Sequence, residues 1–145
     1  MPLKFRNLNT TPEAPVEEWG FEGLLAAIER GDQTHWHRIA LALEADPRGK
    51  VAGELTEVLE AVENTGMAEL FRRIQYSALA HAEQGERAAV AARLQEFLSR
   101  SGLSRAEFAA RLGTSQSRLS TYLTGKVVPS AVIIIRAEGT ARSAA

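Results

Sequence analysis

The sequence predicts an all-α protein in two parts, a helical bundle and a second helical domain. Nearly every segment of the 145 residues has apolar side chains at three- and four-residue spacing, and the alternating pattern of strands is absent. The charge also changes sign: residues 1–85 contain eight Lys or Arg and fourteen Asp or Glu, a net of −6, whereas residues 86–145 contain nine and four, a net of +5. We therefore expect a loose arm over 1–15, an acidic helical domain over 16–85 and a basic domain over 86–145.

Four helices are predicted in the acidic part. The first ends at Gly31, and Asp32 is a suitable N-cap for the second. The residues Asp46-Pro47-Arg48-Gly49 are typical of a turn, and the third helix is expected to end near Asn64-Thr65-Gly66. The fourth begins near Met67. The apolar stripes that predict these helices are Phe21, Leu24, Leu25 and Ile28; Trp36, Ile39, Ala40 and Leu43; Val51, Leu55, Val58, Leu59 and Val62; and Leu70, Phe71, Ile74 and Ala78.

Between Met67 and Ser101 the helical pattern has one interruption, Gly85. Glycine inside a helix costs about 1 kcal/mol relative to alanine, which weakens a long helix without preventing it. Two structures remain open at this point. Either one long helix joins the two parts, or two helices meet at a flexible hinge at Gly85.

Composition excludes several classes of protein. The chain has no cysteine, which excludes disulfides, cysteine-based zinc sites and thiol nucleophiles. No apolar run approaches the roughly 18 residues that a membrane span needs. The polar N-terminal stretch, with Pro12 and Pro15, lacks the apolar segment of a signal peptide, so we expect a cytoplasmic location and no contact with membranes.

Potential ligands and nucleophiles do not form a recognisable catalytic or metal site. His35 and His37 project about 200° apart on a helix, and His81 is distant in sequence, so we expect no zinc site. No serine has the glycine context of a nucleophile elbow, and no glycine-rich loop for phosphate is present. Trp19, Phe21 and Trp36 can line a ligand pocket, but aromatic side chains at helical spacing are more often core. We expect neither enzymatic activity nor a cofactor.

The basic part contains two short predicted helices joined by a tight turn. Their sequence is LSRAEFAARLGTSQSRLSTYLTGK, residues 103–126. Ser104 and Glu107 have the spacing of a capping box, which predicts the start of the first helix. Gly113 ends this helix, because glycine readily adopts the left-handed conformation that a tight turn requires. Such a helix-turn-helix allows the second helix to enter a major groove.

The second helix is expected from Gln116 to Leu123, with apolar residues Leu119, Tyr122 and Leu123 facing inward. Its outward side chains are polar and include no acid. Gln can pair with adenine, Arg with guanine, and Ser or Thr with several base edges. The side chains that we therefore predict to contact bases are Gln116, Ser117, Arg118, Ser120 and Thr121. Contacts to phosphates are predicted at helix ends and in the following loop, for Arg105, Ser115, Thr124 and Lys126.

Residues 88–140 resemble the Cro/repressor (XRE-type) helix-turn-helix family, whose domains are lambda-repressor-like. The matching residues are Gly102-Leu103-Ser104, Glu107-Phe108-Ala109, Leu112-Gly113, Ser115-Gln116-Ser117, Leu119-Ser120, Gly125-Lys126 and Pro129-Ser130. The resemblance implies base contacts for the residues that match Gln116, Ser117 and Ser120. It implies backbone contacts for those that match Arg105 and Thr124, although the family often has Gln at the position of Arg105.

The end of the domain is expected to differ from this family. The family's domain usually has five helices, but only ten residues follow Ile135. We therefore expect the fifth helix to be missing or replaced by packing from the N-terminal half. After a predicted N-cap at Ser130, the run Ile133-Ile134-Ile135 is expected to form a short buried helix.

We interpret the chain as a sequence-specific transcriptional regulator, a repressor, that binds double-stranded DNA through the helix starting at Gln116. The expected assembly is a homodimer, and two symmetric copies would bind half-sites about 34 Å apart. The domain over 16–85 would then serve dimerisation or partner binding.

Three alternatives remain open. The chain can be the antitoxin of a toxin–antitoxin pair, in which the N-terminal domain neutralises a toxin and the C-terminal domain autoregulates the operon. It can be an interaction protein whose helix-turn-helix no longer binds DNA. A small-molecule sensor, with Trp19 and Trp36 in the ligand site, is the third.

Overall fold

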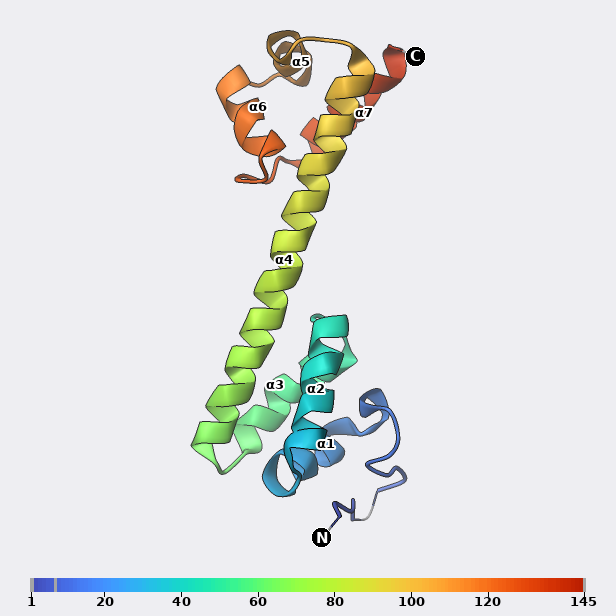
Figure 1. Cartoon of the computed structure of the whole chain (residues 1–145), viewed down its shortest axis with the longest axis vertical. Coiled ribbons are helices and arrows are strands. Elements are labelled where there is room, and N and C mark those ends of the chain that lie inside the picture. Colours follow the sequence, from blue (N-terminus) through green and yellow to red (C-terminus); the bar gives the residue numbers. More distant parts are fainter. Residues whose placement is uncertain (1, 7, 145) are drawn as a thin grey trace. The chain divides into compact units, whose positions relative to one another are not determined.

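The computed structural model describes residues 2–6 and 8–144, and all regular secondary structure in this part of the chain is helical. The predicted all-α fold is therefore confirmed. The chain divides into two compact units, Met1–Ala82 (unit 1) and Glu83–Ala145 (unit 2), which are described separately below (Figure 1).

Unit 1 is a small helical bundle. A 3-10 helix, η1 (Val16–Glu18), precedes α1 (Gly20–Arg30), α2 (Gln33–Ala45) and α3 (Lys50–Ala61), and the first part of α4 (Thr65–Ser101) completes it. Helix α1 packs mainly against α3, and α2 contacts both of them.

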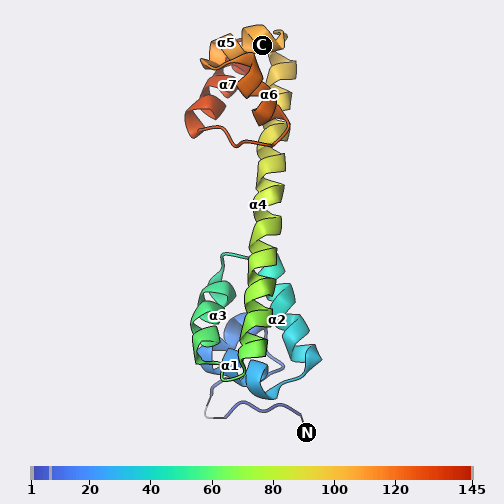
Figure 2. The same cartoon turned by 90° about the vertical axis from the view of Figure 1, so that its left-hand side faces the viewer.

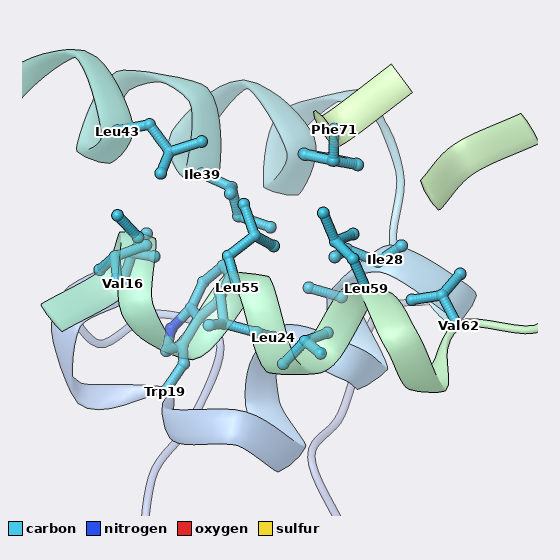
Figure 3. Packing of buried hydrophobic residues seen from close by; sticks show 14 of the residues in the cluster. Val16, Trp19, Leu24, Ile28, Ile39, Leu43, Leu55, Leu59, Val62 and Phe71 are labelled. Atoms are coloured by element: carbon cyan, nitrogen blue, oxygen red, sulfur yellow. The ribbon is translucent and has the colours of Figure 1, made fainter. Parts of the chain in front are cut away.

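The core of unit 1 receives a side chain from every element, as Figure 3 shows. Trp19, Ile39 and Phe71 belong to it and expose 2% or less of their surface. The indole N–H of Trp19 donates to the carbonyl oxygen of Ala14 at 3.0 Å, and that of Trp36 donates to a carbonyl in α1 at 2.9 Å. Both tryptophans therefore pack within the bundle and use their polar atom there. In the N-terminal arm, the partly buried Phe5 packs edge-on against Trp19.

Helix α2 begins at the predicted N-cap. Oδ1 of Asp32 accepts a hydrogen bond from the N–H of Thr34 at 2.9 Å, which lowers the pKa of the Asp32 carboxyl. Nδ1 of His35 accepts from the N–H of Asp32 at 3.1 Å and completes a capping box. His35 therefore has a local structural role at this helix start.

Helix α4 is one continuous helix of 37 residues that includes Gly85. Of the two open structures, the long helix is the one observed. It begins at Thr65, two residues before the predicted start, because Oδ1 of Asn64 accepts from the N–H of Met67 at 3.1 Å. Within the described part of the chain, no helix combines the length and the apolar character needed to cross a membrane.

Unit 2 consists of the remainder of α4 together with α5 (Arg105–Leu112), α6 (Gln116–Leu123) and α7 (Ala131–Ser143) (Figure 2). Its core is formed by residues from all four helices, among them the fully buried Leu94, Phe108, Leu112, Leu119 and Ala137.

Helix α7 differs from the short buried helix that we expected for the isoleucine run. It begins after Ser130, as predicted, but it has 13 residues. Ile133 is 9% exposed, whereas Ile135 is 67% exposed. The inward stripe runs through Ile133, Ala137 and Ala141 at four-residue spacing, so the helical period places Ile135 on the outer side.

Candidate nucleic-acid interface

The start of α5 is fixed by Ser104. Its Oγ accepts a hydrogen bond from the N–H of Glu107 at 3.2 Å, as an N-cap should. The predicted capping box is incomplete, however. The carboxylate of Glu107 accepts from the Ser104 hydroxyl at 2.9 Å, and this hydroxyl takes the place of the backbone N–H as its donor. The helix start is therefore correct, but the second half of the predicted motif is not formed.

The turn between α5 and α6 has the backbone conformation that the sequence predicts. Gly113 has φ of 76°, in the left-handed region. Its N–H donates to the carbonyl oxygen of Ala110 at 3.1 Å, and the next N–H, of Thr114, donates to that of Ala109 at 3.0 Å. These two hydrogen bonds pair the carbonyl groups of the last turn of α5 and end the helix at Leu112. Helix α6 then begins at Gln116.

Helix α6 has the predicted bounds and the predicted inner face. Oγ of Ser115 accepts from the N–H of Arg118 at 3.1 Å, and Leu119, Tyr122 and Leu123 are buried. Four of the five residues predicted to contact bases are exposed, namely Gln116, Ser117, Arg118 and Ser120. The fifth, Thr121, is half-buried, and its hydroxyl donates to the carbonyl oxygen of Arg118 at 2.6 Å.

The four residues predicted to contact phosphates are all exposed at the ends of α5 and α6. Arg105 is the first residue of α5. Because Ser115 uses its oxygen as the N-cap acceptor, its hydroxyl hydrogen is still available for an anion. Thr124 donates to the carbonyl oxygen of Thr121 at 3.2 Å, and Lys126 follows it in the connection to α7.

Two side chains from outside the motif bind the C-terminal ends of its helices. Nε2 of Gln95, in α4, donates to the carbonyl oxygen of Leu123 at 2.7 Å. Nη1 of Arg136, in α7, donates to that of Leu112 at 2.9 Å. Sequence reasoning missed both residues, because neither lies within 20 positions of the carbonyl that it binds.

The electrostatic character of the motif follows from its composition. The motif has one acid, Glu107 in the first turn of α5, whose carboxylate accepts from the Ser104 hydroxyl. Residues 108–137 contain no Asp or Glu, and their cations are Arg111, Arg118, Lys126 and Arg136. Elsewhere in unit 2, Glu96 pairs with Arg100 and Glu138 pairs with Arg142, each one turn apart on its own helix. A polyanion that approached α6 would therefore meet cations and neutral polar groups.

Comparison with known proteins agrees with this geometry. The model of a protein family described as a helix-turn-helix domain matches residues 89–137, from the second half of α4 into α7. No curated protein and no solved structure matches the chain. The match, the tight turn and the acid-free α6 together define unit 2 as a helix-turn-helix domain of the DNA-binding class.

Proposed function

We propose that the chain is a sequence-specific transcriptional regulator of the Cro/repressor (XRE) type that acts as a repressor. The observation that supports this most is the outer face of α6. There Gln116, Ser117, Arg118 and Ser120 are exposed, whereas Leu119, Tyr122 and Leu123 are buried. A short helix with such a face can enter a major groove, where amide, guanidinium and hydroxyl groups distinguish base pairs.

The roles divide between bases and backbone. Gln116 and Arg118 are the side chains able to make bidentate pairs with adenine and guanine. Arg105, Ser115, Thr124 and Lys126, at the helix ends, would bind phosphates and fix the orientation of α6 in the groove. Thr121 would contribute through its methyl group or its hydroxyl oxygen, because its hydroxyl hydrogen is already donated within α6.

The experiment that tests this proposal is selection of bound duplexes from a random DNA pool, followed by affinity measurements at several salt concentrations. We expect one enriched sequence and an affinity that falls steeply as salt increases. The variant Arg118→Ala should lose preference for that sequence. A matched control is Arg73→Ala, which removes the same charge from an exposed side chain of unit 1. Absence of any enriched sequence would contradict the proposal.

We also propose that two copies act together on DNA. Unit 2 exposes apolar surface that a second copy can cover, at Val127, Val128, Val132 and Ile135. Symmetric pairing predicts that the selected DNA is palindromic, with half-sites about 34 Å apart. Sedimentation equilibrium with and without that DNA would measure the stoichiometry, and a single copy on an asymmetric site would exclude symmetric pairing.

The antitoxin role is the second candidate, and it concerns unit 1. Helices α2 and α4 expose Leu41, Leu70 and Tyr76 there, which favours a protein partner or dimerisation for this unit. The test is co-expression with the product of the neighbouring gene. Relief of that protein's toxicity together with copurification would support the antitoxin role. Full relief by unit 2 alone would contradict it.

A further inference from the structure

We infer that Arg136 is a positioning residue for DNA recognition: from α7, it fixes the turn that sets the start of α6. This inference rests on the proposed DNA-binding function. Arg136 lies outside the predicted DNA-contacting set.

The geometry of Arg136 relates it directly to the turn. Its Nη1 donates to the carbonyl oxygen of Leu112, the last residue of α5, at 2.9 Å. The same Nη1 lies 3.0 Å from where a Cβ on Gly113 would be, and its Cζ lies 4.0 Å from that point. The guanidinium therefore lies directly against Gly113, whose backbone has a left-handed conformation.

The chemistry of this contact favours a fixed turn. The last carbonyls of a helix have no partner within the helix and carry partial negative charge. A guanidinium that donates to one of them makes a charge-assisted bond, which is shorter and stronger than a neutral one. The turn's own bonds, from the N–H groups of Gly113 and Thr114, run back to α5 only. Arg136 ties the same turn to a different helix, α7.

The position of the turn matters because α6 starts so soon after it. Ser115, the N-cap of α6, is three residues after Leu112, and Gln116 and Arg118 follow within the next turn of helix. Side chains that make directional contacts have to be held within about 0.5 Å of their productive geometry. Loss of the Arg136 contact should therefore weaken base-specific contacts, whereas phosphate contacts carry no sequence information and contribute to binding of any duplex.

The experiment uses the full chain with the variants Arg136→Met, Arg136→Lys and Arg142→Met. Methionine removes the donors and the charge but retains length, whereas lysine retains a charge and one donor that can reach Leu112. Arg142→Met is the matched control, because Arg142 is exposed on the same helix and pairs with Glu138. Affinity is measured for the selected duplex and for a scrambled duplex at several salt concentrations.

We expect Arg136→Met to lower the ratio of specific to scrambled affinity by roughly tenfold, the scale of one well-made base contact. Its affinity for the scrambled duplex and its salt dependence should equal those of Arg142→Met, which removes the same charge from the same helix. Arg136→Lys should restore most of the ratio, and Arg142→Met should leave it unchanged. Affinity can also fall equally on both duplexes, with the slope of log affinity against log salt concentration smaller by about one. That result would show a phosphate contact and overturn the inference.

Hydrogen exchange of the DNA-free protein gives a second measurement. Arg136→Met should speed exchange of the Gly113 and Thr114 amides relative to Arg142→Met, and Arg136→Lys should do so less. Unchanged exchange would overturn the inference even if no DNA is bound. If the parent chain binds no DNA but the three variants differ in exchange as expected, the proposed DNA-binding function is contradicted, whereas the role of Arg136 in fixing the turn is not.

Discussion

The guanidinium carbon of Arg38 lies 4.9 Å from the centre of the Trp19 ring. The same side chain donates to the main-chain carbonyl oxygens of Pro12 and Ala14, and Trp19 donates to Ala14 as well. One cation thus joins α2 to the segment before η1 and covers the largest aromatic side chain of the unit 1 core.

The Arg38→Met variant should destabilise unit 1 by about 1–3 kcal/mol. It removes a cation–π contact and two charge-assisted bonds while retaining much of the aliphatic packing. Both tryptophans, Trp19 and Trp36, belong to unit 1, so tryptophan fluorescence during urea unfolding measures this unit. Arg73→Met is the control, because Arg73 makes an exposed pair with Glu69 and should change stability by less than about 0.5 kcal/mol.

Asp32→Asn should make unit 1 less sensitive to acid. The pKa of the Asp32 carboxyl is lowered in the folded protein chiefly by the hydrogen bond that it accepts from the N–H of Thr34. A lowered folded pKa adds stability above the ordinary aspartate value of about 3.9, and this is lost as pH falls through the folded value. The advantage of the parent chain over Asp32→Asn should therefore be constant near neutrality and shrink in acid. Urea midpoints across that pH range measure it, and an advantage that grows toward low pH would contradict the assignment.

Gly113→Ala and Gly139→Ala should have opposite effects on unit 2. At Gly113, alanine costs about 1–2 kcal/mol for the left-handed backbone, and its Cβ would also crowd Arg136. At Gly139, within α7, the added Cβ would meet no atom within 4 Å other than its chain neighbours and the backbone of its own helix, so alanine should stabilise by about 0.5–1 kcal/mol. Hydrogen exchange of the α5–α7 amides compares the two. Equal effects would mean that the turn does not need a glycine.

Arg118→Ala should cost about 1–3 kcal/mol of binding free energy on the selected DNA and relax preference at one base pair. The reason is that a bidentate guanidinium contact distinguishes guanine from the other bases. The measurement is competition against a set of single-base variants of the site. Equal loss for every sequence in the set would make Arg118 a phosphate contact.

Lys126→Ala should weaken binding by a similar factor on all sequences and reduce the salt slope by about one. Lys126 lies beyond the end of α6, where a cation can bind a phosphate without meeting a base edge. Titration of selected and scrambled duplexes at several salt concentrations provides both quantities. A change in preference at one base pair, with the slope intact, would contradict this role.

Local patterns allowed accurate predictions in the helix-turn-helix. Ser104 and Ser130 cap the helices that they were expected to cap, and Gly113 has the expected backbone conformation. These features depend on residues within three or four positions of one another, so the sequence alone contains what determines them. The inner face of α6 was predictable for the same reason, because helical periodicity places its apolar residues on one side.

Features that depend on tertiary contacts were not predictable in this way. Arg136 and Leu112 are 24 positions apart, and no local pattern indicates that one binds the other. Ile135 belongs to an apolar run whose composition does not state which member faces outward. His35 completes a capping box at a position where the usual pattern has Glu or Gln, and its imidazole nitrogen substitutes for that acceptor.

Helix α6 has eight residues, which at a rise of about 1.5 Å each makes it roughly 12 Å long. Stacked base pairs are about 3.4 Å apart, so a helix of this length spans roughly four of them. A given sequence of four base pairs occurs by chance about once in every 250 positions, whereas a genome offers about 10⁶–10⁹ competing positions. Two copies reading roughly eight base pairs reduce the chance frequency to about one in 65,000. Among about 10⁶ positions this frequency still leaves about 15 chance matches, so pairing of two copies reduces the number of competing sites but does not by itself specify a single locus.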